Sequence, residues 1–158
     1  MSNRNRIVAV ALSALFLSLP LAQGARAETS IGLRGGLSID PDQVLIGLHV
    51  QPPAVGRNLY VVPSGEAGFG SDAFTLSFNG DLQYQFGASE DVRPYAGGGL
   101  SIYYYDHDRG GSDSEFGVNA LGGLLFARNS GKPIFLEMKL GLTDRMPDWK
   151  FLVGLMFR

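Results

Sequence analysis

The chain has 158 residues, carries a formal net charge of −2 at pH 7 and contains no cysteine. Without cysteine it can form neither disulfides nor thiolate metal sites, and it offers no cysteine nucleophile and no N-terminal cysteine for a lipid anchor. The charge balance leaves no basic footprint for a nucleic acid partner. A charged fraction of only 18% is low for a surface that charge keeps soluble.

The first 27 residues have the three parts of a secretory signal peptide. Arg4 and Arg6 supply a basic start, residues 7–22 form an apolar run, and Ala25 and Ala27 frame a small-x-small cleavage site. The apolar run is short for a membrane-spanning helix and no charged flank follows it, which leaves an uncleaved anchor as the alternative. We therefore predict a signal peptide over 1–27 and a single domain over 28–158.

After this segment the sequence alternates between apolar and polar residues, which is the period of a β-strand with one apolar and one polar face. The alternation predicts four strands in the first half, over residues 30–38, 43–50, 59–69 and 73–86. From Phe74 to Phe86 every even position is apolar or glycine and every odd position is polar. In the third strand Pro63 suggests a bend or a bulge, because proline cannot donate to a strand ladder.

Four more strands are predicted in the second half, over residues 92–105, 116–127, 134–142 and 149–157. The sixth is apolar on both faces near its end, where Leu121 and Leu125 lie on the otherwise polar face. The glycine runs Gly97–Gly99 and Gly122–Gly123 lie within strands. This position favours close backbone approach, or room for large side chains, over a phosphate cradle.

The segments between the strands are short and rich in Gly, Pro, Asp, Asn and Ser. Connections of this length join antiparallel neighbours as hairpins and are too short for a crossover helix. An even number of strands places both ends of a barrel on one side. The sequence therefore predicts an all-β fold, a single eight-stranded antiparallel up-and-down transmembrane β-barrel that follows a cleaved signal peptide.

Aromatic residues of the apolar face gather toward both ends of the predicted strands. Phe74 and Tyr84 lie ten residues apart. At about 3.3 Å per residue and a tilt of about 40°, such a segment climbs roughly 25 Å, the height of the apolar band between two aromatic girdles of a membrane barrel. The predicted girdle consists of Phe69, Phe74, Tyr84, Phe86, Tyr104, Phe116, Phe126, Trp149 and Phe157. This spacing favours an apolar face that meets lipid.

The polar face carries sparse charges of both signs, which are predicted to point into a narrow lumen. Buried charges are costly unless they pair, so Asp81 should find a basic partner in Arg34, Lys139 or Lys150. His49 is expected to join the interior hydrogen bonds rather than act as a ligand or base. The predicted lumenal network consists of Arg34, His49, Glu66, Asp81, Arg93, Glu137, Lys139 and Lys150. Other expected lumenal side chains are Tyr60, Tyr95 and Tyr103. Because side chains fill an eight-stranded lumen, we expect a plug rather than a conducting path.

Four segments carry a family resemblance: the "ARA" cleavage site, "VRPYAGGGLSIYY", "FGVNALGGLLF" and the terminal "WKFLVGLMFR". With them the chain from residue 28 onward resembles the small eight-stranded outer-membrane β-barrel proteins of Gram-negative bacteria, the OmpA-like and OmpX-like group. The resemblance implies an outer-membrane location, contact with outer-membrane lipid and insertion by a barrel-assembly machinery that reads a terminal aromatic residue. Here Phe157 is penultimate and Arg158 is last, which departs from that signal.

The segment "DHDRGGSDSE" is the longest predicted outward loop and gathers residue types used in catalysis and metal binding. They are Asp106, His107, Asp108, Ser112, Asp113 and Ser114. One interpretation is a Ser–His–Asp hydrolase or acyltransferase acting on lipid A, but a triad is defined by a geometry that adjacent loop residues do not supply. A calcium loop would lack its terminal bidentate acid, because Gly117 stands there. We expect a solvated polar loop.

These features predict an integral outer-membrane barrel with a structural role or a role in surface contacts, without catalysis, metal or cofactor. The sequence does not specify a surface partner. The first alternative is a periplasmic soluble barrel of lipocalin type, in which the apolar face would line a ligand cavity. The second alternative is a lipid A-modifying barrel enzyme that uses the loop residues.

Overall fold

The computed structural model describes residues 29–71, 73–87, 91–107, 112–126, 132–144 and 146–157. They form eight strands: β1 (Ser30–Ile39), β2 (Gln43–Gln51), β3 (Leu59–Gly70), β4 (Ala73–Gln85), β5 (Val92–His107), β6 (Ser112–Phe126), β7 (Ile134–Gly141) and β8 (Trp149–Phe157). None of the described residues belongs to a helix long and apolar enough to cross a membrane. The predicted signal peptide, with Ala25 and Ala27, lies outside the described residues.

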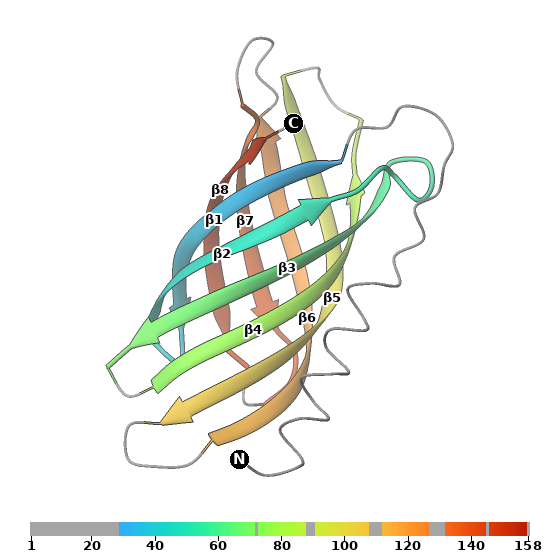
Figure 1. Cartoon of the computed structure of the whole chain (residues 1–158). Helices are drawn as coiled ribbons and strands as arrows, with labels where there is room; N and C mark the ends of the chain where they lie inside the picture. Colours follow the sequence, from blue (N-terminus) through green and yellow to red (C-terminus); the bar gives the residue numbers. More distant parts are fainter. Residues whose placement is uncertain are drawn as a thin grey trace.

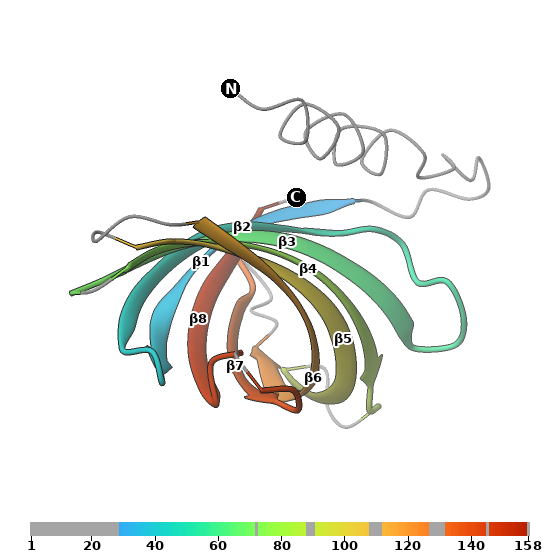
Figure 2. The same cartoon turned by 90° about the horizontal axis from the view of Figure 1, so that it is seen from below.

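The strands close into a barrel in chain order (Figures 1 and 2). Each strand pairs antiparallel with the next, and β8 returns to β1 in a ladder from Ile31↔Phe157 to Ile39↔Trp149. The predicted eight-stranded antiparallel barrel is confirmed. The start of β1 and the end of β8 share one end of the barrel, called here the terminal end; the opposite end is called the distal end.

The β5–β6 hairpin is longer than the sequence predicted. β5 continues to His107, β6 begins at Ser112, and Asp106 pairs directly with Ser112. The apolar alternation stops at 105 and resumes at 116, but backbone hydrogen bonds hold a strand ladder and can continue under polar side chains. The predicted outward loop is therefore largely strand, which corrects the sequence prediction.

Pro63 introduces no extra residue into its strand. The β3–β4 register runs without interruption through Val62↔Asp81, Pro63↔Gly80 and Ser64↔Asn79. The β2–β3 ladder ends at His49↔Ser64, next to the proline. The proline thus marks the end of one ladder, as expected for a residue that cannot donate a backbone hydrogen bond, and the predicted bulge is absent from this register.

The connections at the distal end are mostly shorter than those at the terminal end. At the distal end they comprise residues 40–42, 71–72, 108–111 and 142–148, and at the terminal end residues 52–58, 86–91 and 127–133. Membrane barrels generally have short turns on the side of their termini and longer loops on the other side. Here the distal connections are mostly the shorter ones, so little chain remains beyond the distal rim for a large binding surface.

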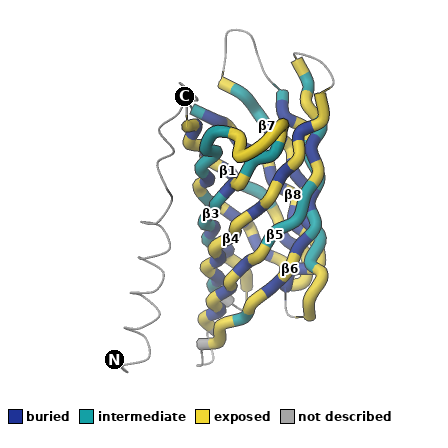
Figure 3. Tube along the Cα trace, turned by 90° about the vertical axis from the view of Figure 1, so that its right-hand side faces the viewer, coloured by how far each residue is buried: buried dark blue, intermediate teal, exposed yellow. Residues whose placement is uncertain are grey.

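Buried and exposed residues alternate along the strands (Figure 3). The consecutive residues Leu100 and Ser101 illustrate the pattern, because the leucine is 54% exposed and the serine 1% exposed. Polar and charged side chains dominate the interior, and large apolar side chains cover the exterior. This arrangement is the reverse of the apolar interior of a soluble protein.

Glycines on the inner face make room for lumenal side chains. A Cβ atom on Gly99 would lie 2.1 Å from Oδ1 of Asp81, and one on Gly123 would lie 2.5 Å from the hydroxyl of Tyr95. A Cβ atom on Gly97 would lie 1.9 Å from the carbonyl oxygen of Leu82. The predicted close approach within the glycine runs is confirmed.

Candidate functional site in the barrel lumen

Four charged side chains from four strands meet in the middle of the lumen. Nη1 of Arg34 lies 3.0 Å from Oε1 of Glu66 and 3.6 Å from Oε1 of Glu137. Nζ of Lys150 lies 2.7 Å from Oε2 of Glu66. All four side chains are at most 3% exposed. Glu66 thus links β3 to both β1 and β8 across the barrel interior.

Lys139 contacts two acidic side chains, Asp81 and Glu137. Its ammonium group forms an ion pair and a hydrogen bond with Oδ2 of Asp81 and lies 3.9 Å from Oε1 of Glu137. Asp81 therefore pairs with Lys139, one of its three predicted partners. With Arg34 and Lys150 opposite Glu66 and Glu137, the cluster balances three bases against three acids, as buried charges require.

A chain of neutral polar groups links the strands beside the ion pairs. The Asn119 amide donates to the Ser101 hydroxyl (3.1 Å), which donates to the Asn79 carbonyl oxygen (2.7 Å). The Asn79 amide in turn donates to Oγ of Ser64 (3.3 Å), which also accepts from Arg34 (3.3 Å). Ser64, Asn79, Ser101 and Asn119 were not in the predicted lumenal network, although they lie on the same alternating face as its charged members.

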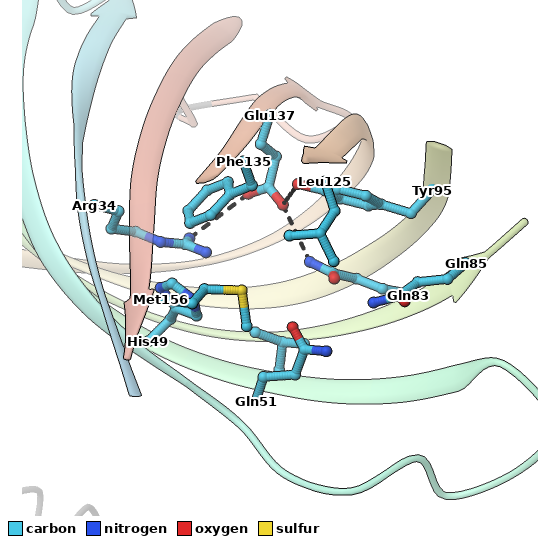
Figure 4. A pocket seen from close by; sticks show the side chains of 11 residues that line it. Arg34, His49, Gln51, Gln83, Gln85, Tyr95, Leu125, Phe135, Glu137 and Met156 are labelled. Carbon is cyan, nitrogen blue, oxygen red and sulfur yellow. Dashed lines mark hydrogen bonds and ion pairs between the residues drawn. The ribbon is translucent and has the colours of Figure 1, made fainter. Parts of the chain in front are cut away.

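A small cavity of about 10 Å³ lies at the terminal side of the ion pairs (Figure 4). Above it, Oε2 of Glu137 accepts hydrogen bonds from the Tyr95 hydroxyl (3.0 Å) and from the Gln83 amide (3.1 Å). The Arg34 guanidinium and the His49 ring border it from the other side. His49 also packs edge-on against the Phe135 ring, with the ring centroids 5.0 Å apart.

Two apolar clusters flank the polar middle of the lumen. Near the terminal end the buried residues Tyr95, Leu121, Leu125, Phe135 and Met156 pack together. Near the distal end Tyr103, Tyr105 and Met146 form a second buried cluster. The alternation identified Leu121 and Leu125 as apolar positions of the inner face. Phe135 and Met156 occupy the same face and were missed, and Met146 lies in a connection, where no periodic signal exists.

The structure places the predicted lumenal residues at different depths. Seven of the eight are buried in the lumen: Arg34, His49, Glu66, Asp81, Glu137, Lys139 and Lys150. Arg93 is exposed near the start of β5, at the barrel mouth, so its membership in the interior network is corrected. The reason is position along the strand, because the alternation defines a face but not a depth. Tyr95 and Tyr103 are buried, whereas Tyr60 is only half-buried.

All nine predicted girdle residues lie on the outer surface. Five stand toward the distal end: Phe69, Phe74, Tyr104, Phe116 and Trp149. Four stand toward the terminal end: Tyr84, Phe86, Phe126 and Phe157. Six are exposed, and Phe74, Phe126 and Phe157 are half-buried. The Lys132 ammonium lies 4.3 Å from the centre of the Phe157 ring.

The loop residues that could supply a Ser–His–Asp triad or a calcium site, an interpretation not favoured by the sequence, do not form such a site among the described residues. Asp106 is an exposed strand residue, and Oδ1 of Asp113 accepts a hydrogen bond from the backbone of Ser114 at 2.9 Å. Asp108 and the side chains of His107 and Ser112 lie outside the described part of the chain. No group of three or more His, Asp or Glu side chains among the described residues could hold a metal ion.

Comparison with solved structures identifies the architecture. The fold is that of small eight-stranded outer-membrane barrels. The N-terminal β-barrel domain of Pseudomonas aeruginosa OprF superposes with a TM-score of 0.67 at 17% identity, covering 82% of this chain and 96% of that one. The Yersinia pestis outer membrane protein Ail, in a phospholipid bilayer nanodisc, gives 0.58 at 14% identity, covering 84% and 99%. The outer membrane enzyme PagL gives 0.52 at 16% identity, covering 82% and 99%.

At these identities the likeness concerns the fold alone. No protein-family model and no curated protein sequence matches the chain.

Proposed function

We propose that the chain is an integral outer-membrane β-barrel with a structural role, whose lumen is closed by the ion-pair network and which carries out no catalysis. The observation that carries the proposal is the inverted burial pattern. Leu33, Leu100 and Val153 are about half exposed on the outer wall, whereas charged side chains fill the interior. Such a wall is stable in lipid and would be an aggregation surface in water.

Strand length and closure also support a membrane location. β1 has ten residues and β8 has nine, which is the length that crosses a bilayer at a tilt of about 45°. A closed barrel leaves no edge strand, so its backbone polar groups are satisfied without water. The two bands of aromatic residues fit the two interfaces of a bilayer.

The interior supports a closed lumen rather than a channel. Arg34, Glu66 and Lys150 reach across the middle of the barrel and pair there. Breaking such pairs would leave uncompensated buried charges, which is strongly unfavourable. The short distal connections favour a structural role over a large surface for binding another cell or protein.

The lipocalin-type alternative requires an apolar cavity for a ligand. The large apolar side chains instead face outward, and the lumenal cavity beside Arg34 and Glu137 measures about 10 Å³. The burial pattern therefore counts against this alternative. The alternative of a lipid A-modifying enzyme has the fold likeness to PagL in its favour, but no catalytic geometry among the described residues supports it.

We also propose where the chain resides and what it contacts. Residues 1–27 would direct export, and the barrel would reside in the outer membrane of a Gram-negative bacterium in contact with its lipid. The barrel-assembly machinery would insert it, with Phe157 as the aromatic residue closest to the C-terminus.

Expression of the full chain in a Gram-negative host, followed by fractionation, tests the proposal. We expect recovery in the outer-membrane fraction and a change of gel mobility on boiling, because a closed barrel in detergent resists unfolding until it is heated. Recovery in the aqueous periplasmic fraction without detergent would contradict the membrane proposal. An Ala25→Leu, Ala27→Leu variant, which removes the small residues of the cleavage site, should retain the unprocessed length.

A further inference from the structure

The lumenal network leaves polar atoms unsatisfied at its terminal side. Nε of Arg34, Nδ1 of His49 and Oε1 of Glu137 are buried and have no hydrogen-bond partner among the described residues. All three residues line the same cavity of about 10 Å³ (Figure 4). Buried polar groups are nearly always hydrogen-bonded, and a polar cavity of about this size holds one water molecule. The cavity therefore fits bound water.

The same cavity reaches toward the terminal end of the barrel. Gln51 and Gln85 line it, and they are the last residues of β2 and β4. Gln83 lies one step deeper on the same face and donates to Glu137. These amide side chains provide polar groups along one wall of the cavity, from the terminal mouth down to the ion pairs, and Leu125, Phe135 and Met156 of the terminal apolar cluster also line it. Water can therefore approach Glu137 along the glutamines.

The connection between β7 and β8 lies at the distal end of the barrel. It is fixed at its base by backbone hydrogen bonds from Leu142 to Val118 (2.9 Å) and from Gly141 to Asp148 (3.1 Å). The backbone of Val118 also donates to the hydroxyl of Thr143 (3.0 Å). These bonds hold the connection against β6, at the distal mouth.

Met146 enters the lumen from this connection. It is 6% exposed and packs with Tyr103 and Tyr105, whereas Thr143 and Asp144 beside it are exposed. The Thr143 hydroxyl lies 3.0 Å from the Met146 sulfur. A Cβ atom on Gly117 would lie 1.9 Å from that sulfur, so the thioether occupies the space that any side chain at position 117 would need.

A continuous column joins this methionine to the ion pairs. Beneath Met146 the ring of Tyr103 lies 4.8 Å from the Lys150 ammonium, and Lys150 in turn pairs with Glu66. Ser101, which pairs across the ladder with Gly117, is 1% exposed beside this column. The distal end also has buried polar side chains, but the Gln43 amide donates to the Thr75 hydroxyl (2.9 Å) and the Ser77 hydroxyl donates to Glu66 (3.4 Å). Unlike the glutamines that line the terminal cavity, these side chains are engaged with each other and with the ion pairs.

We propose that the lumen is a water-binding recess, open toward the terminal end and stoppered at the distal end by Met146. The bound water would complete the hydrogen bonds of Arg34, His49 and Glu137. The inference rests on the part of the proposed function that describes a folded barrel whose lumen is closed by the ion-pair network.

Cysteine accessibility tests the recess directly, because the chain has no cysteine of its own. Single cysteines would be placed at Gln85, Ser101 and Leu100 in the full chain, refolded in lipid nanodiscs and exposed to a charged methanethiosulfonate reagent. We expect Gln85→Cys to react and Ser101→Cys to remain unreactive. Adding Met146→Ala should accelerate labelling of Ser101→Cys at least about tenfold, because truncating a buried methionine removes the packing that opposes local opening.

Two further variants separate the stopper from general loosening. Met146→Leu conserves volume, so it should leave Ser101→Cys unreactive. Gly117→Ala should accelerate labelling like Met146→Ala, because its methyl group displaces the sulfur while Met146 itself is unchanged. Each variant is scored only on the heat-modifiable, folded band. Should Met146→Ala not fold, Gly117→Ala provides the same test.

Three results would overturn the inference: an unreactive Gln85→Cys, labelling of Ser101→Cys as fast as Gln85→Cys with Met146 in place, or no acceleration in either Met146→Ala or Gly117→Ala. Leu100→Cys tests the proposed function separately. On a lipid-facing wall it stays unreactive in every background, whereas rapid labelling in a folded barrel would refute the membrane location and leave the recess unaffected.

Discussion

Asp81 is the most deeply buried charge of the lumen, at 0% exposed, and Lys139 is the base that pairs with it. Arg34 and Glu66, by contrast, each contact two opposite charges. Removing one base therefore has different consequences at different places in the network. Without Lys139, the buried Asp81 carboxylate has no second base to compensate its charge.

At the residue scale, Lys139→Met should destabilise the barrel by about 3–5 kcal/mol, because it leaves Asp81 as an uncompensated buried charge. Adding Asp81→Asn should restore part of this loss, since the neutral amide no longer needs a counter-charge. Urea unfolding in lipid, followed through the fluorescence of the single tryptophan, Trp149, measures both variants. Lys132→Met, at an exposed lysine, is the control. Equal stability of the two lysine variants would show that the pair contributes nothing.

At the element scale, each strand supplies two different surfaces from one alternating sequence. In β6 the neighbouring glycines Gly122 and Gly123 serve opposite faces. A Cβ atom on Gly123 would lie 2.4 Å from the carbonyl oxygen of Leu136 and would meet the Tyr95 ring, whereas one on Gly122 would have an ordinary contact at 3.8 Å. The glycine run is therefore required on its inner side only.

Gly123→Ala should cost about 1–3 kcal/mol of unfolding free energy, because overpacking displaces the Tyr95 ring or the β7 backbone. Gly122→Ala, one residue earlier on the outer face, should change stability by no more than about 0.5 kcal/mol. Urea unfolding measures both variants. Where their m-values are equal, the difference between their midpoints gives the difference in unfolding free energy. A larger loss for Gly122→Ala would mean that the inner and outer faces of β6 are assigned in reverse.

At the scale of the whole molecule, the barrel has an apolar exterior, a polar middle and an apolar cluster toward each end of the lumen. The outer wall is stable only where no water meets it, and the inner charges are stable only where they pair. Along each strand the outward-facing residues must therefore be apolar, and charged residues on the inward face must pair with each other.

Leu100→Arg should destabilise the barrel in lipid by about 2–4 kcal/mol, because it places a guanidinium on the lipid-facing wall. Asp106→Arg lies on the same strand, six residues farther toward the distal rim, and should have little effect since the side chain there can reach water. Refolding yields and urea midpoints in lipid vesicles measure both. A change at Leu100 within about 0.5 kcal/mol, as for an ordinary surface substitution, would place this wall in water.

The sequence by itself determined the strands, their two faces and the class of fold, because a period of two is a local property that each segment shows independently. It also indicated which residues face inward, and Asp81 accordingly has one of its expected partners. The alternation does not tell how deep in the lumen a residue lies. Arg93 was therefore predicted to belong to the interior network, whereas it is exposed at the mouth of the barrel.

Only the tertiary structure decided which inward residues meet. Glu66 and Lys150 are separated by 84 positions, and barrel closure with a defined register brings them within hydrogen-bond distance. Met146 lies in an aperiodic connection, so its insertion against Gly117 depends on where the β7–β8 connection packs. Local alternation sets the faces of each strand, whereas the pairings across the lumen follow from long-range register, which no short segment encodes.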